Sequence, residues 1–218
     1  MADKSQVALS DRLKRIYKKL YASFGPQGWW PADSPFEVMV GAILTQNTNW
    51  LNVEKAIRNL KEKKLLDPLK LYRLPRAGLA GLIRPAGYYN IKAKRLKAFL
   101  KFFCGDCRAD LQGLKRQDTA ALRGKLLAVN GVGPETADSI LLYALGKPTF
   151  VVDAYTKRIF FRHGLIKEDD QYHQVQNLFM QNLKNEVKLF NEYHALLVKL
   201  GKDYCLKNKP RCRICPLR

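Results

Sequence analysis

Apolar positions recur every three or four residues along most of the chain, which is the period of an amphipathic α-helix. Residues 8–24 show this period and stop at Gly25-Pro26, a pair that ends helices. Residues 36–46 are apolar on nearly every face, so we expect this helix at the centre of a core. Further helices are expected at about 50–63, after Pro68 and Pro75, and over 91–103, 118–128, 134–145, 154–164, 168–183 and 186–202.

Capping residues indicate where some of these helices begin. Residues 34–37 (SPFE) have the order of a capping box, with a serine N-cap, a proline in the first turn and a closing glutamate. Asn90 is expected to cap the basic helix that follows it. Only Thr149–Val152 resembles a strand, and it is four residues long. The pattern therefore predicts an all-α fold.

The net charge of the chain limits the kinds of partner that it is expected to bind. Its 218 residues carry 39 Lys and Arg against 19 Asp and Glu, a formal net charge of +20. No apolar run approaches the roughly 20 residues that cross a membrane, and the N-terminus lacks the apolar stretch of a secretory signal. We therefore expect a soluble cytoplasmic protein, nucleoid-associated if bacterial, that binds nucleic acid by releasing counterions from phosphates. The alternative is that the charge serves solubility alone.

A glycine turn joins two expected helices within residues 126–145. Gly131 and Gly133 permit positive φ and a close approach of the backbone to a ligand, and Pro134 fits the first turn of the second helix. Such a turn directs backbone amides at one place and suits a DNA phosphate, without reading sequence. A plain helical hairpin with a glycine C-cap is the alternative.

Four motifs in order resemble the helix-hairpin-helix DNA glycosylase superfamily, of which endonuclease III is a member. They are a loop at 44–48 (LTQNT), a loop at 87–93 (GYYNIKA), the glycine turn followed by V-D-x4-R at 152–158, and a cysteine tail. The resemblance covers nearly the whole chain. It implies an all-α, two-domain helix-hairpin-helix glycosylase fold with a C-terminal Cys-rich cluster loop. Residues 28–147 would form a six-helix domain, and residues 1–27 plus 148–218 a second helical domain.

The resemblance also implies a mechanism. Asp153 matches the family's essential Asp, which stabilises an oxocarbenium-like sugar and helps a water attack; an N-cap is its local alternative. Bifunctional members have a Lys where this chain has Glu135, and a glutamate forms no Schiff base. The implied enzyme is therefore monofunctional and leaves an abasic site. A nearby Lys acting in place of the missing one is the alternative.

The tryptophans suggest a substrate. Together with Glu135, they resemble the 3-methyladenine DNA glycosylase III branch, which reads alkylated purines largely by stacking. Such purines are cationic and favour aromatic faces. The implied base pocket is Trp29, Trp30, Pro31, Trp50 and Glu135. The alternatives are core and hinge aromatics, an enzyme for oxidised, deaminated or mismatched bases, and a non-catalytic DNA-binding protein.

The partner implied is damaged double-stranded DNA, bound by a monomer. Gln46 and Tyr88 match residues that fill the gap left by a flipped base and wedge the opposite strand. A polar helix end and a loop aromatic packed on the core are their alternatives. Lys92, with its basic neighbours, contacts phosphate or forms a solvated face. The implied DNA-binding set is Gln46, Tyr88, Asn90, Lys92, Gly131 and Gly133.

The cysteine spacing is unusual. Cys205-x6-Cys212-x2-Cys215 resembles the first three ligands of the C-x6-C-x2-C-x5-C segment that holds a [4Fe-4S] cluster in endonuclease III. The fourth Cys would lie three residues beyond Arg218. The alternatives are a truncation of the chain before a fourth Cys, an unusual fourth ligand, zinc, or no metal. The three histidines have no metal spacing, and we expect them to be structural or surface residues.

Overall fold

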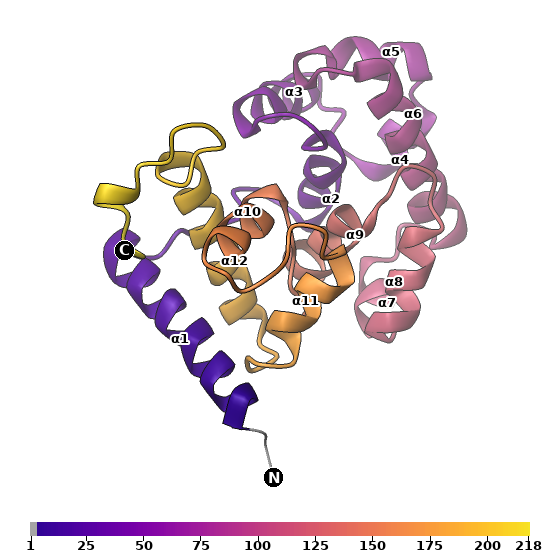
Figure 1. Ribbon diagram of the computed structural model, residues 1–218. Helices are drawn as coiled ribbons and strands as arrows, with labels where there is room; N and C mark the ends of the chain where they lie inside the picture. Colours follow the sequence, from indigo (N-terminus) through magenta and orange to yellow (C-terminus); the bar gives the residue numbers. More distant parts are fainter. Residues whose placement is uncertain (1–3) are drawn as a thin grey trace. The chain divides into compact units, whose positions relative to one another are not determined.

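The computed structural model describes residues 4–218, and its regular structure is helical throughout this range (Figure 1). No strand occurs between residues 4 and 218, so the all-α prediction is confirmed. The chain divides into two compact units. The contiguous unit is Ala32–Lys147, and the discontinuous unit joins the chain up to Pro31 with Pro148–Arg218. Residues 28–31, expected in the six-helix domain, group with the discontinuous unit.

In the contiguous unit, α2 (Pro35–Leu44) is the central helix, as its apolar pattern predicts. Every residue from Phe36 to Leu44 is buried, and the helix packs against its neighbours on several sides. The other elements are α3 (Trp50–Glu62), α4 (Pro68–Arg73), α5 (Arg76–Leu82), η1 (Arg84–Ala86), α6 (Tyr89–Leu100), η2 (Lys101–Asp106), α7 (Leu111–Arg116), α8 (Thr119–Leu127), α9 (Pro134–Ser139) and η3 (Ile140–Ala144).

The start of α2 follows the predicted capping box with one change. The Ser34 hydroxyl accepts a hydrogen bond from the Glu37 N–H at 3.2 Å. The Glu37 carboxylate closes on the N–H of Asp33, at 3.0 Å, and not on that of Ser34. Its other oxygen lies 2.7 Å from the Lys61 ammonium on α3. Glu37 therefore ties α3 to the start of the central helix.

In the discontinuous unit, α12 (Val187–Asp203) packs against α1 (Lys4–Phe24) and α10 (Ala154–Arg162). The unit also contains α11 (Tyr172–Met180) and the short η4 (Cys212–Ile214). Aromatic rings fill its core: Phe150 stacks on Phe179 with ring centroids 3.7 Å apart, and Tyr193 meets both edge-on. None of the helices among residues 4–218 has the length and apolar character needed to cross a membrane.

Candidate nucleic-acid interface and catalytic carboxylate

Asp153 is the N-cap of α10, as its sequence position allows. Its backbone is extended, and its Oδ1 accepts a hydrogen bond from the Thr156 N–H at 2.7 Å. An N-cap of this kind satisfies one of the amides left open at a helix start, and it fixes the rotamer of the carboxylate. The side chain is 12% exposed. The cap therefore holds a nearly buried carboxylate in a single orientation.

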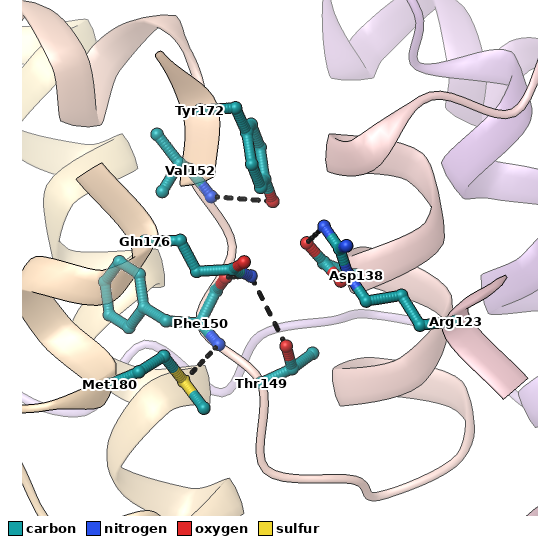
Figure 2. A network of polar contacts seen from close by, with 8 residues as sticks. All are labelled: Arg123, Asp138, Thr149, Phe150, Val152, Tyr172, Gln176 and Met180. Carbon is teal, nitrogen blue, oxygen red and sulfur yellow. Dashed lines mark hydrogen bonds and ion pairs between the residues drawn. The ribbon is translucent and has the colours of Figure 1, made fainter. Parts of the chain in front are cut away.

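The segment Thr149–Val152 before Asp153 has no regular structure and pairs with no strand within residues 4–218. Three side chains on one face of α11, at four-residue intervals, bond its backbone instead (Figure 2). Tyr172 accepts from the Val152 N–H at 3.3 Å, Gln176 donates to the Phe150 carbonyl at 2.7 Å, and Met180 Sδ accepts from the Phe150 N–H at 3.3 Å. The i, i+4, i+8 spacing was visible in the sequence, but its partner was not.

Two opposing effects act on the pKa of Asp153. Burial raises the pKa, because it disfavours the charged carboxylate. His194 on α12 and the backbone N–H of Thr156 outweigh burial and hold the pKa below its usual range. The His194 Nε2 lies 3.6 Å from Oδ2 of the carboxylate. Asp153 is therefore an ionised carboxylate at neutral pH.

The predicted hairpin forms between α8 and α9. Gly131 has a φ of +85°, and a Cβ at this position would overlap the Arg95 side chain. Gly133 is the extended N-cap of α9, and Pro134 follows at the first helical position. Among residues 4–218, no hydrogen bond uses the N–H groups of Gly131 or Gly133. The turn thus presents amides of the kind that bind a phosphate.

An ion pair joins the two helices of this hairpin (Figure 2). Arg123 on α8 donates from Nε and Nη2 to the two oxygens of Asp138 on α9, at 2.7 and 3.0 Å. The Asp138 side chain is 0% exposed. The sequence alone does not indicate this ion pair, because Arg123 and Asp138 lie on different helices, fifteen residues apart. A planar, two-point pair of this kind fixes the crossing of α8 and α9.

Gln46, expected to enter DNA, is engaged with the hairpin. Its Nε2 donates to the Gly131 carbonyl at 2.9 Å and to the Thr136 hydroxyl at 3.0 Å. Arg95 on α6 donates to its Oε1. The side chain must leave these partners before it can fill a gap in a duplex. Its role in DNA stays a prediction.

The loop before α6 presents Tyr88. Gly87 has a φ of +68° and Tyr88 a φ of +45°, and the Tyr88 side chain is 69% exposed. A bulky residue with positive φ is strained, and such residues gather at functional sites. Tyr88 is the N-cap of α6, so the prediction that Asn90 caps this helix is wrong. Asn90 is exposed in the first turn, beside Tyr88 along the chain.

Lys92 differs from its expected role as a DNA contact. It is 1% exposed, and its ammonium donates to the carbonyls of Leu44 and Ala86 at 2.7 and 2.8 Å. Burial, followed by the repulsion of Arg95, lowers its pKa to about 8. A lysine in this position joins the ends of α2 and η1 and does not reach a phosphate. The expectation of a phosphate contact is corrected: the structure gives Lys92 a structural role.

The expected pocket residues come from both units. Trp29 and Trp30 are half-buried in the discontinuous unit, with ring centroids 5.2 Å apart, and Pro31 after them is exposed. Trp50 is half-buried at the start of α3, and Glu135 is exposed in the first turn of α9. Their assembly around a base stays a prediction.

The cysteine tail does not form a metal site in this structure. Cys205 is buried, Cys212 exposed and Cys215 half-buried, and no group of metal-ligating side chains gathers among the described residues. Arginines of α10 hold the start of the tail: Arg162 Nη1 lies 3.3 Å from the Cys205 Sγ, and Arg158 donates to the Cys205 carbonyl at 2.7 Å. These thiols do not fit a cluster as placed, and the [4Fe-4S] cluster stays a prediction.

Comparisons with known proteins identify the class. Residues 40–185 match the family described as "HhH-GPD superfamily base excision DNA repair protein". The chain is 49% identical over 209 residues to "Putative DNA repair glycosylase MJ1434" of Methanocaldococcus jannaschii, covering 95% of this chain and 94% of that protein. It is 30% identical to endonuclease III of Rickettsia conorii, covering 84% and 81% of the two chains. The chain therefore belongs to the HhH-GPD superfamily of base excision DNA repair proteins.

One solved structure adds detail. The H. pylori 3-methyladenine DNA glycosylase MagIII, bound to 1,N6-ethenoadenine, superposes with a TM-score of 0.74 at 29% identity. The match covers 90% of this chain and 97% of that one. Together with the family match, it confirms the helix-hairpin-helix glycosylase fold that the motifs predicted.

Proposed function

We propose that the protein is a monofunctional DNA glycosylase that excises alkylated purines, such as 3-methyladenine, from duplex DNA. The observation that carries the proposal is Asp153, a nearly buried carboxylate held ionised at the start of α10. A fixed negative charge stabilises the oxocarbenium character that a sugar acquires as its base leaves. The carboxylate also helps orient the water that attacks the sugar, and the product is an abasic site.

The DNA would be held through its phosphates and opened by the exposed loop. The amides of Gly131 and Gly133 suit a phosphate, and the net charge of +20 supplies affinity that falls with salt. Tyr88, exposed and aromatic, suits the wedge, with Asn90 beside it and Gln46 as the residue that fills the gap. A monomer is sufficient for this arrangement.

The choice of alkylated purines rests on the tryptophans and on one relative. Cationic purines stack well on indole rings, which Trp29, Trp30 and Trp50 would supply, with Pro31 following Trp30 in the chain. The 29% identity to a 3-methyladenine glycosylase along 90% of the chain supports the same choice. These bases are good leaving groups, so a site with a single ionised carboxylate is sufficient for their release.

A panel of duplexes tests the proposal directly. Duplexes with an alkylated, an oxidised or a deaminated base are incubated with the protein, with and without borohydride. We expect release of the alkylated purine alone and no covalent adduct, because Glu135 replaces the amine of a Schiff base. Release of oxidised pyrimidines would favour the endonuclease III activity, and a trapped adduct would establish a lyase. No release from any duplex would favour a DNA-binding protein without catalysis.

Trp30 provides a second prediction. Stacking on one aromatic ring contributes about 1–3 kcal/mol per base, so Trp30→Ala should slow excision by roughly 10- to 100-fold. Binding to undamaged duplex should change little, since phosphate contacts supply it. Tyr21→Ala, at an exposed tyrosine of the same unit, is the matched control. Single-turnover excision and a binding titration measure both effects. Equal losses of excision and binding would mean that Trp30 only packs in the core.

A further inference from the structure

His194 stands beside the candidate catalytic carboxylate. It lies in the middle of α12, is 6% exposed, and places Nε2 at 3.6 Å from Oδ2 of Asp153. The other carboxylate oxygen, Oδ1, already accepts from the Thr156 N–H. Each oxygen of Asp153 therefore has its own neighbour, one from α10 and one from α12. The sequence predicts only a structural or surface role for His194, because nothing near it in the chain is a metal ligand or a nucleophile.

We propose that His194 is a positioning residue for Asp153, holding the second carboxylate oxygen in place and keeping the group charged for catalysis. The proposal rests on the proposed glycosylase function and deepens it. It assigns His194 no contact with the DNA. The imidazole acts through the carboxylate, which it approaches to 3.6 Å from a separate helix.

Because Asp153 is nearly buried, its carboxylate needs a neighbour that keeps it ionised. A carboxylate with little solvent around it tends to take up a proton, which would remove the charge that stabilises the sugar cation. The pKa of Asp153 nevertheless lies below its usual range, and His194 is the first of the neighbours that oppose burial, ahead of Thr156. Because α12 packs against α10, the two side chains keep their separation without a flexible loop between them. Removing the imidazole should therefore raise the pKa of Asp153.

Other charged or titratable groups on the packed helices are engaged elsewhere. On α10, the Lys157 ammonium donates to the Asp170 carbonyl at 2.6 Å, and Arg158 donates to the Gly201 carbonyl at 3.0 Å. On α12, the Tyr193 hydroxyl donates to the Leu13 carbonyl of α1 at 2.9 Å. Further groups with partners elsewhere are Arg162 on the tail carbonyls, Glu192 on the Gln27 N–H, Tyr17 beside Glu192, and the Lys199–Asp203 pair.

Two substitutions separate positioning from packing. His194→Leu fills the place of the imidazole in the core with an apolar side chain and removes its N–H groups. His194→Gln keeps a side-chain N–H donor. His173→Leu, at an exposed histidine of α11, is the matched control. The carboxyl carbon of Asp153 is followed by NMR across pH, with its signal assigned by its loss in Asp153→Asn. Single-turnover excision is followed over the same pH range on the duplex that the panel selects.

We expect His194→Leu to move the titration of Asp153 to higher pH, with the acid limb of excision moving by the same amount. Its maximal rate should fall by about 10- to 100-fold, the order expected when a catalytic group loses its fixed position. His194→Gln should restore part of both, and His173→Leu should change neither.

Two results would overturn the proposal. One is an Asp153 titration that is the same in wild type and His194→Leu, and the other is a set of rates that fall only as thermal stability falls. The NMR measurements need no catalysis, so they test the His194–Asp153 pair even when no base is released from any duplex. Failure of the glycosylase function is read from the duplex panel, and failure of the pair from the titration. If His194→Leu does not fold, the titration of Asp153 in His194→Gln is compared with that in the wild type, and this comparison still decides.

Discussion

Asp153→Asn should abolish base release and leave binding to abasic-site DNA largely unchanged. The substitution removes the negative charge, and the loss of one preorganised electrostatic partner of a developing charge costs on the order of 10²–10³-fold. Here the carboxylate is the only catalytic group proposed, so we expect a loss at or beyond the upper end of that range. Asparagine is as good an N-cap as aspartate, so α10 should still begin at Ala154.

A second N-cap aspartate gives a matched control. Asp118 caps α8 by accepting from the Ala121 N–H at 2.9 Å, and it is exposed. Asp118→Asn makes the same chemical change at the same kind of position, in the other compact unit. Single-turnover excision should fall for Asp153→Asn alone. If both variants lose activity equally, or if Asp153→Asn also loses its affinity for abasic DNA, Asp153 is a structural cap and another group carries catalysis.

The sequence predicted the features that depend on neighbouring residues. The N-caps at Ser34 and Asp153 follow from local backbone and side-chain geometry, and the apolar run of α2 requires burial wherever it lies. The glycine turn was likewise readable, because few other residues take the φ of Gly131. These features needed no knowledge of what packs against them.

Features that depend on distant residues were not readable. Lys92 sits in a basic stretch and looks like a surface lysine, but the ends of α2 and η1 place two carbonyls around its ammonium. His194 likewise gains its meaning only when α12 brings it to Asp153. The extended segment at 149–152 has a strand's composition, yet side chains of α11 take the place of a second strand. In each case, the partner lies on an element that the local pattern does not specify.

The largest expected effect on stability is at the ion pair of the hairpin. Arg123→Met leaves the fully buried Asp138 carboxylate without its guanidinium, and breaking one side of a buried pair costs about 3–5 kcal/mol. The double variant Arg123→Met/Asp138→Leu should recover much of this loss, because no buried charge remains. The phosphate binding that we propose for the glycine turn should weaken in the single variant, since α8 and α9 flank that turn.

Arg116→Met is the matched control, because Arg116 pairs with Asp110 at 3.7 Å while both side chains are exposed, by 73% and 53%. Exposed pairs contribute about 0–1 kcal/mol. Urea unfolding should therefore show a clearly larger loss of stability for Arg123→Met than for Arg116→Met. The same ranking should appear in affinity for undamaged duplex at fixed salt, since only Arg123 joins the helices that present the turn. A similar loss of stability in both arginine variants would mean that solvent reaches Asp138 and that packing alone fixes the hairpin.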